Sequence, residues 1–201
     1  MPGGPAPGRA ALPRIAAMAR NVEIKARIDS VEAWLPRVRA LADGAAEALA
    51  QDDTFFACAN GRLKLRDFGD GRGQLIFYQR PDGPGPKESR YRIHETAHPG
   101  ELRDTLAAAL GVIGRVVKRR LVFRRGRTRL HLDRVDGLGD FLELEVVLGE
   151  GQTTEAGMAI AEELCSRLGI DAASRLAGAY RDLLEAAGAF PAAPPGGGDG
   201  A

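Results

Sequence analysis

The segment Asn21-Val22-Glu23-Ile24-Lys25-Ala26-Arg27-Ile28 alternates strictly between polar or charged residues and apolar residues. Successive side chains of a β-strand point to opposite faces, so the four apolar residues share one face of a predicted strand. Asn21, Glu23, Lys25 and Arg27 share the other face. A surface strand usually presents a mixed, small and neutral polar face, whereas this face is almost entirely charged.

The same alternation recurs in three later segments. They are residues 62–66 (RLKLR), 127–133 (RTRLHLD) and 142–146 (LELEV). Basic strands and acidic strands therefore follow one another along the chain. If their charged faces converge on a shared interior, that interior holds many cations and several carboxylates. Such a chamber suits a polyanion together with its metal ions.

Composition limits the class of protein. The chain has 201 residues, enough for one domain with a core, and its 28 basic residues balance 27 acidic ones. This balance excludes a nucleic-acid-coating protein, which would carry a global basic excess. Cys58 and Cys165 lie far apart, which favours two reduced thiols in a cytoplasmic protein. No apolar run reaches the roughly 18 residues of a membrane span.

Both ends differ in composition from the rest. Residues 1–17 are rich in Pro, Gly and Ala and are predicted to be a disordered leader or a mis-assigned start before Met18. Residues 191–201 form a Pro/Gly-rich tail that cannot bury enough surface to become ordered. The predicted folded domain is residues 18–190.

Hydrophobic periodicity predicts an α+β fold with eight strands. The expected strands are residues 20–28, 47–57, 62–67, 74–80, 87–95, 112–125, 127–135 and 140–149. The expected helices are residues 31–42, bent or shortened by Pro36 and closed by Gly44, then 98–110, 154–168 and 173–187. Strands that follow one another as hairpins close most simply into an antiparallel barrel.

Six short motifs together resemble one known family. They are NVEIK (21–25), LKLR (63–66), YQR (78–80), VKRR (117–120), ELE (143–145) and SRL (174–176). The first is similar to the ExExK signature of the CYTH family, the triphosphate tunnel metalloenzymes. This family includes class IV adenylyl cyclases, thiamine triphosphatases and inorganic triphosphatases. The resemblance covers residues 20–187 and implies an eight-stranded antiparallel barrel that forms a tunnel flanked by helices.

The resemblance implies a cationic site for a small-molecule triphosphate, and the chemistry of the residues agrees. Guanidinium forks and ammonium groups suit phosphate oxygens. The candidate substrate-binding residues are Lys25, Lys64, Arg66, Arg80, Lys118, Arg120 and Arg175, of which Lys25 and Arg66 are the catalytic candidates. Arg62, Lys87, Arg124 and Arg129 are secondary candidates.

Carboxylates beside a polyphosphate call for a metal ion. Mg²⁺ or Mn²⁺ favours carboxylate, water and phosphate oxygens. The candidate ligands are Glu23, Asp133, Glu143 and Glu145. The first Glu of the signature is Asn21 in this chain. An amide oxygen can still bind Mg²⁺, but one negative charge is missing, which leaves the number of bound metals open.

Simpler interpretations exist for single residues. Taken alone, Glu143 and Glu145 fit a solvated strand face, and the basic runs at 118–120 and 124–127 fit a surface or a nucleic-acid patch. No two histidines have metal-ligand spacing, so His94, His98 and His131 are interpreted as structural or solvated. Residues 69–73 lack the Gly-Lys-Ser/Thr ending of a phosphate loop and are predicted to form a turn. Trp34, at helical spacing, is assigned to the core. The arginines of opposite strand parity are assigned to the surface; they are Arg90, Arg119 and Arg125.

The sequence favours a metal-dependent triphosphatase, with an inorganic, thiamine or nucleoside triphosphate as substrate. A class IV adenylyl cyclase is the alternative, because it uses nearly the same machinery. It ranks second because the sequence shows no evident base-recognition motif. A non-catalytic polyphosphate- or nucleotide-binding module is a second alternative. An RNA-binding barrel is disfavoured because aromatic residues are only 5% of the chain. Neither a nucleic-acid nor a membrane partner is expected, and the oligomeric state stays open.

Overall fold

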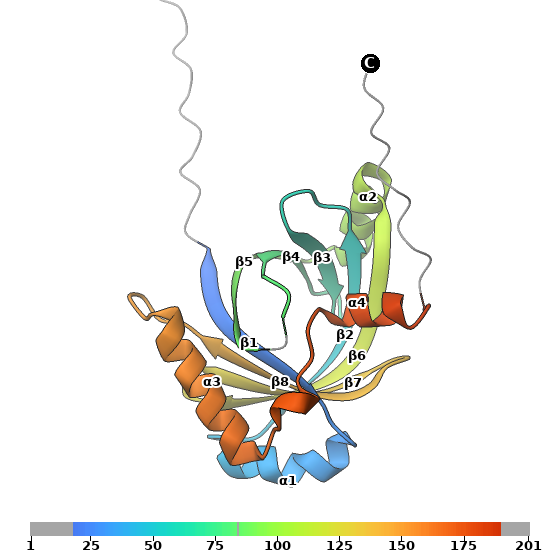
Figure 1. Cartoon of the computed structure of the whole chain (residues 1–201). Helices are drawn as coiled ribbons and strands as arrows, with labels where there is room; N and C mark the ends of the chain where they lie inside the picture. The colour runs from blue at the N-terminus through green and yellow to red at the C-terminus, as the bar shows by residue number, and fades with distance from the viewer. Residues whose placement is uncertain (1–17, 84, 190–201) are drawn as a thin grey trace, which may run out of the picture.

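Eight strands and four α-helices make up the computed structural model over the residues it describes, 18–83 and 85–189 (Figure 1). The strands are β1 (Ala19–Arg27), β2 (Glu47–Phe56), β3 (Arg62–Asp67), β4 (Gly73–Gln79), β5 (Lys87–Thr96), β6 (Val112–Arg125), β7 (Thr128–Val135) and β8 (Gly139–Val147). The helices are α1 (Val31–Leu41), α2 (Pro99–Leu110), α3 (Thr154–Leu168) and α4 (Tyr180–Ala186). The predicted leader and tail lie outside the described residues.

The strands form a closed antiparallel barrel in the order β1-β5-β4-β3-β2-β6-β7-β8. The predicted barrel is confirmed, but the expected succession of hairpins is wrong at two places. β1 pairs with β5 and β8, and β2 pairs with β6 rather than with β1. Both departures follow an inserted helix, α1 or α2. A hairpin needs a short loop, so these long connections allow the chain to cross to a strand that is not next in sequence.

The apolar face of the barrel points outward and is covered by helices. Val22, Ile24 and Ala26 of β1 are buried in one core with the outward residues of β7 and β8 and with residues of α1 and α3. Figure 1 shows these two helices packed on the outside of the barrel. Full burial of one aliphatic side chain stabilises the fold by about 1.5–3 kcal/mol. The covering helices therefore hold the barrel together from outside, which leaves its interior to the charged face.

One end of the barrel interior is closed by a second apolar cluster. Phe55, Val116, Val135 and Phe141 point inward near that end, and Tyr180 and Leu184 of α4 pack against them. The rings of Phe141 and Tyr180 lie 4.9 Å apart between centroids. The C-terminal helix therefore supplies part of the floor of the interior.

The expected helix over residues 173–187 is wrong in its first half. Residues 172–174 form a single 3-10 turn, and Arg175 then pairs with Ala26 in an isolated β-bridge. The backbone N–H of Leu176 donates to the carbonyl of Lys25 at 2.9 Å. Gly178, at φ +80°, lies in the left-handed region that favours glycine, and α4 begins only after it. This extended segment ties the C-terminal part of the chain to the strand that carries Lys25.

The first helix also ends earlier than expected. Ser30 caps it by accepting from the backbone N–H of Ala33, as predicted, and the helix continues through Pro36 to Leu41. Its C-cap is Ala42 rather than Gly44.

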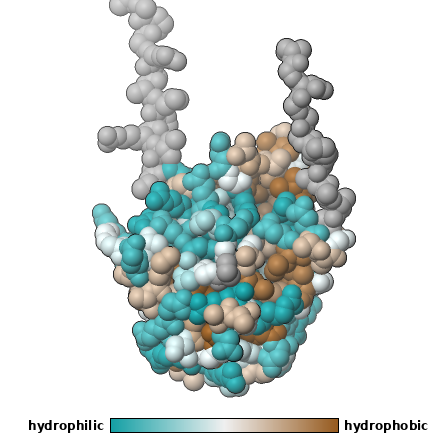
Figure 2. Space-filling model, in the orientation of Figure 1, coloured by the Kyte–Doolittle hydropathy of each residue, from teal (hydrophilic) through white to brown (hydrophobic). Residues whose placement is uncertain are grey.

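Three further features complete the description. Apolar side chains gather over α2, where Leu110 is exposed (Figure 2). Both cysteines are free, as expected. Among the described residues, no helix has the length and hydropathy needed to cross a membrane.

Candidate functional site

The interior of the barrel is a cavity of about 660 Å³ lined by inward side chains from all eight strands. Val116, Phe55 and Tyr180 lie at its closed end. Strand parity predicted a shared cavity, and this is confirmed for five residues. They are Lys25, Arg66, Lys118, Arg120 and Glu145. Lys64, Arg80, Glu23 and Glu143 line the same cavity.

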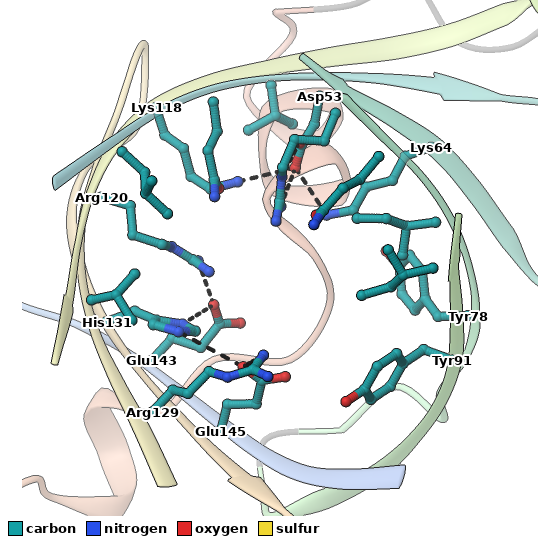
Figure 3. A pocket seen from close by; sticks show the side chains of 18 of the residues that line it. Asp53, Lys64, Tyr78, Tyr91, Lys118, Arg120, Arg129, His131, Glu143 and Glu145 are labelled. Carbon is teal, nitrogen blue, oxygen red and sulfur yellow. Dashed lines mark hydrogen bonds and ion pairs between the residues drawn. The ribbon is translucent and has the colours of Figure 1, made fainter. Parts of the chain in front are cut away.

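Three of the predicted cations surround one carboxylate, that of Asp53 on β2. Arg66 donates to both of its oxygens at 2.7 and 2.9 Å, and Lys64 and Lys118 donate at 2.9 and 3.0 Å. Figure 3 shows Lys64 and Lys118 approaching Asp53 from opposite sides. A phosphate group offers the same kind of acceptor as this carboxylate. The cluster is therefore arranged to bind an anion before any ligand arrives.

Burial changes the proton affinity of this cluster. It lowers the pKa of Lys118 to about 7 and that of Lys64 to about 8, against the opposing effect of Asp53. Burial also acts to raise the pKa of Asp53, but Arg66, Lys118 and Lys64 together hold it well below its usual range. The two lysines therefore titrate near neutral pH while Asp53 stays ionised.

These lysine pKa values predict a pH-dependent loss of triphosphate binding. Each lysine is charged below its lowered pKa and neutral above it, so cation–phosphate attraction weakens as pH rises through about 7 to 8. We expect kcat/KM for a triphosphate to fall over this range, because this ratio reports the pKa values of the free enzyme.

Lys118→Arg supplies the matched test, since a guanidinium stays charged throughout this range. The variant should show a flatter pH profile of kcat/KM. Arg119→Lys, on the exposed face of the same strand, should not change the profile. If the pH profile of Lys118→Arg matches that of the wild type, titration of Lys118 does not cause the fall in kcat/KM.

A second cluster surrounds Glu143 on β8. Lys25 donates to one of its oxygens at 3.0 Å, and Arg120 donates to the other at 2.6 Å. His131 of β7 lies between the two acidic residues of β8. Its Nδ1 is 3.4 Å from Glu143 and its Nε2 is 3.7 Å from Glu145 (Figure 3). His131 is therefore buried and not solvated, and the strand's inward parity places it on the wall of the cavity between two carboxylates.

Asp133 does not line the cavity, which corrects its prediction as a metal ligand. It has the expected inward parity but is fully buried beneath Arg120. Arg120 donates to both of its oxygens at 2.6 and 2.5 Å, and the hydroxyl of Tyr180 donates to it at 2.8 Å. With both oxygens already bound to donors, Asp133 positions Arg120 instead of facing a ligand.

Tyr180 also contacts Lys25. The lysine Nζ lies 3.6 Å from the centroid of the tyrosine ring, an arrangement that attracts a cation to the ring face. Burial raises the pKa of Tyr180 well above its usual value, and Asp133 acts in the same direction. The hydroxyl therefore stays protonated and keeps donating to Asp133. One residue of α4 thus links the positions of Lys25 and Arg120.

Arg175 is not brought to the cavity, which corrects its prediction as a substrate-binding residue. Its guanidinium pairs with Glu162 of α3, with two contacts of 2.7 Å. Its bridge partner Ala26 belongs to the outward face of β1, so the side chain lies outside the barrel.

The secondary candidates divide in the same way. Arg124 and Arg129 line the cavity, and Arg129 pairs with Glu145 at 3.0 Å. Arg62 instead pairs with Asp82 and Asp182, and Lys87 donates to backbone carbonyls, so neither lines the main cavity.

The acidic strands β1 and β8 have donors that fit a hard divalent cation. Glu23 and Glu145 are direct partners across the two strands, and like charges in this position are unfavourable without a cation. Asn21 lies beside them and donates to Glu145. Its buried Oδ1 has no hydrogen-bond partner. An orphaned amide oxygen next to two carboxylates matches the oxygen ligands that Mg²⁺ prefers.

These oxygen atoms do not surround a common point in the structure. Arg80 forms an ion pair with Glu23 at 2.8 Å, and Arg129 forms one with Glu145 at 3.0 Å. Within the described residues, no three His, Cys, Asp or Glu side chains are close enough to hold a metal ion as they stand. Metal binding at Asn21, Glu23 and Glu145 therefore requires that these arginines turn away.

Asp53 and Tyr180 are the main cavity residues that sequence reasoning did not assign. Tyr180 lies in a helix, where the strand parity used for the other cavity residues does not apply. Inward parity within residues 47–57 could have identified Asp53, but both faces of that strand mix polar and apolar residues. The sequence therefore shows no preferred face there.

Comparisons with known proteins agree with this architecture. The family model of the CYTH domain matches residues 19–180. The PH1012 protein from Pyrococcus horikoshii has a TM-score of 0.73 and 23% identity, over 81% of this chain and 98% of its own. A candidate adenylate cyclase from Vibrio parahaemolyticus has a TM-score of 0.68 and 21% identity, over 82% and 97% of the two chains.

A third structure, HpAC1 from Hippeastrum, is described as an adenylyl cyclase candidate with a dominant triphosphatase activity. It has a TM-score of 0.60 and 17% identity, over 85% of this chain and 96% of its own. No curated protein matches the chain. The likeness to these structures shows the fold, and the match of the family model to residues 19–180 establishes that the chain belongs to the CYTH domain family.

Proposed function

We propose that this chain is a divalent-metal-dependent triphosphatase, which hydrolyses a triphosphate bound inside the barrel. One observation carries the proposal: cations from three strands, and one from the residue that follows a fourth, converge on a single cavity that two acidic strands also face. Lys25 comes from β1, Lys64 and Arg66 from β3, and Lys118 and Arg120 from β6, while Arg80 immediately follows β4. A carboxylate-lined surface alone would bind metal but repel phosphate. Cations and carboxylates together suit a metal–triphosphate complex.

The cavity residues can be given distinct roles. The Asp53 cluster binds one phosphate group, since Arg66 can turn its fork from the carboxylate to phosphate oxygens. Lys25 and Arg120, held by Tyr180 and Asp133, face the same cavity from the other side. These cations neutralise the charge that develops on the phosphate oxygens as the P–O bond breaks.

Water supplies the nucleophile, so a triphosphate and water yield a diphosphate and phosphate. Asn21, Glu23 and Glu145 are the residues proposed to hold Mg²⁺ or Mn²⁺. When bound, such an ion shields phosphate charge and lowers the pKa of a water molecule. Arg80 and Arg129 now neutralise the two carboxylates, and both guanidiniums would be free to bind the substrate if these carboxylates held a metal ion.

One assay panel tests this function. Tripolyphosphate, thiamine triphosphate and ATP are each incubated with Mg²⁺, and phosphate, pyrophosphate and cyclic AMP are measured. We expect phosphate release. Cyclic AMP with pyrophosphate would instead identify the alternative, a class IV adenylyl cyclase. The relative HpAC1, with its dominant triphosphatase activity, supports the choice of hydrolysis for this fold. Tight binding without any product would identify a non-catalytic module and contradict the proposal.

The residue at position 21 gives a prediction about the metal. Asn21→Glu adds a carboxylate beside Glu23 and Glu145, and a hard cation gains affinity as the charge of its ligands increases. We expect a lower Mg²⁺ concentration for half-maximal activity. The metal-free variant should also be slightly less stable, because three carboxylates then repel one another.

Gln74→Glu is the matched control for this prediction. It makes the same amide-to-carboxylate change on the cavity wall, but on β4 beside Glu95. Its Mg²⁺ requirement should not fall. An equal or higher requirement in Asn21→Glu would place residue 21 outside the metal site.

A further inference from the structure

Asp53 lies apart from the acidic residues proposed to hold a metal ion. It belongs to β2, whereas Glu23 and Glu145 belong to β1 and β8, and Figure 3 shows Asp53 on the opposite side of the cavity from Glu145. Asp53 lines the cavity although it is only 1% exposed. The cations around it can bind a phosphate group, but an acidic residue among them weakens that binding. The presence of this carboxylate therefore requires an explanation of its own.

Asp53 occupies the donors that a phosphate group needs. Arg66 donates to it through Nε and Nη2, which form one edge of the guanidinium, and Lys64 and Lys118 both donate to Oδ2. Guanidinium and ammonium groups bind phosphate oxygens through the same hydrogen bonds that they form with a carboxylate. A phosphate group that enters this cluster must therefore take donors from Asp53 or share them with it.

A second buried carboxylate is arranged differently. Asp133 accepts from Nε and Nη2 of Arg120, as Asp53 does from Arg66, but Asp133 is fully buried beneath the guanidinium. Asp133 can therefore keep its contacts when Arg120 meets a phosphate group. Asp53 lines the cavity beside its donors, so it lies on the side from which a ligand arrives.

The charge of the cluster also suits a single phosphate group. Lys64, Arg66 and Lys118 carry three positive charges when both lysines are protonated, and Asp53 neutralises one of them. A terminal phosphate group carries about two negative charges when it is fully ionised. With Asp53 present, the two remaining positive charges balance such a group. Without Asp53, a third cation would hold the phosphate group and slow its release.

We propose that Asp53 is an internal competitor of the substrate, which occupies the phosphate-binding cations in the empty cavity, yields them to an entering phosphate group and recovers them as the product phosphate leaves. The inference rests on the proposed function and adds a means of product release to it, a step that limits the turnover of many enzymes. Asp53 takes part in no bond that is made or broken. Its competition limits the affinity of the cavity for phosphate.

The test measures the binding of inorganic phosphate and of tripolyphosphate to Asp53→Asn by calorimetric titration in EDTA. The amide has nearly the size of the carboxylate but no charge, so it competes less for the cations. At about pH 6, where both lysines of the wild type are charged, we expect Kd for each probe to fall by about tenfold or more. An equal or higher Kd in the variant would overturn the inference.

Asp53→Glu is the matched control. It keeps the negative charge and extends the carboxylate by one methylene group, so it still competes for Arg66 and the two lysines. Its affinity for phosphate should not exceed that of the wild type. An equal gain of affinity in Asp53→Glu and Asp53→Asn would show that removal of the charge is not the cause, and would contradict the inference.

A change of pH separates competition from a purely structural role. Asp53 raises the pKa values of Lys118 and Lys64, which burial lowers to about 7 and about 8. The lysines of Asp53→Asn should therefore lose their charge at a lower pH, and the gain of affinity should shrink as the pH rises from about 6 to about 8. A constant ratio of the two Kd values would contradict the inference. The other groups that face these lysines stay the same in the variant; they are Arg66, Arg120, Tyr78 and Tyr180.

Thermal unfolding shows whether the variant folds. Three cations lose their counter-charge, so the Tm of Asp53→Asn should be lower than that of the wild type and should rise more when inorganic phosphate is added. If the variant is unfolded without a ligand, phosphate should restore its folding at concentrations that leave the wild-type Tm unchanged. A variant that phosphate does not restore would overturn the inference.

Failure of the proposed function gives a different result. In that case neither protein releases phosphate from a triphosphate, while the difference in phosphate affinity between them remains. If both proteins are active, inorganic phosphate should inhibit Asp53→Asn at a lower concentration than the wild type, and kcat of the variant should be lower. Equal inhibition of the two enzymes by phosphate would overturn the inference.

Discussion

Arg120→Ala is expected to lower the free energy of unfolding by about 3–5 kcal/mol, because it leaves a buried carboxylate without its partner. Arg120 donates to both oxygens of Asp133 and to Glu143, and Asp133 is fully buried. Tyr180 still donates to Asp133 in the variant, but a hydroxyl does not neutralise its charge. Activity should fall as well, since the cavity loses a cation. Urea denaturation of the variant and the wild type measures the stability loss.

Arg66→Ala is the comparison that separates stability from binding. Asp53 keeps Lys64 and Lys118 when Arg66 is removed, so the protein should fold nearly as well as the wild type. The lost charge-assisted contact with a phosphate is worth about 1.5–3 kcal/mol, or about tenfold to a hundredfold in kcat/KM. Arg119→Ala, on the exposed face of β6, should alter neither property. Equal stability of Arg120→Ala and Arg66→Ala would show that Asp133 does not need Arg120.

Acid should partly restore the stability of Arg120→Ala. In the wild type, burial acts to raise the pKa of Asp133, but Arg120 outweighs it and lowers the pKa. Without the guanidinium, burial should raise the folded-state pKa above the unfolded value. The protonated form is then favoured by folding, so stability is present at low pH and is lost as pH rises through the raised pKa. A deficit that does not shrink as the pH is lowered would contradict this explanation.

Strand parity predicted most of the interior because the contrast between two faces is strong on some strands. On β1, Val22 and Ile24 alternate with Glu23 and Lys25, so only one register buries the apolar side chains outside. The same contrast identified Glu145 on β8, whereas Arg120 was identified by the resemblance of residues 117–120 to a family motif. On β2 the inward Gln51 and Asp53 alternate with Asp52 and Thr54, so neither face is distinct. Asp53, the centre of the cation cluster, was therefore missed.

The depth of a side chain, its direction outside regular strands and the order of the strands could not be predicted from strand parity, because they depend on contacts between distant segments. Asp133 has the inward parity of a ligand, but its depth is set by Arg120 and Tyr180 packed over it. Arg175 lies on no regular strand, so the pattern did not specify its direction. The strand order was also beyond local patterns, because β2 meets β6 only after three intervening strands and α2. These features arise from tertiary packing of segments that are distant in sequence.

Removal of divalent metal with EDTA is expected to abolish triphosphate hydrolysis, and Glu145→Gln should raise the Mg²⁺ concentration needed for half-maximal rate. The reason lies in the pairing of Glu23 with Glu145 across β1 and β8. Arg80 and Arg129 now neutralise these carboxylates at 2.8 and 3.0 Å. When the arginines turn to phosphate oxygens, two carboxylates remain face to face, and a divalent cation relieves their repulsion.

This arrangement makes metal and substrate binding mutually dependent. Mn²⁺ should bind more tightly in the presence of a non-hydrolysable triphosphate than in its absence, and calorimetric titration measures this without turnover. Glu95→Gln is the matched control, because Glu95 also lines the cavity but accepts from Gln74 at 2.8 Å on the opposite hairpin. Its Mg²⁺ requirement should match that of the wild type. Full activity in EDTA, or an equal change in both variants, would show that Glu145 serves only to hold Arg129 and Asn21 in place.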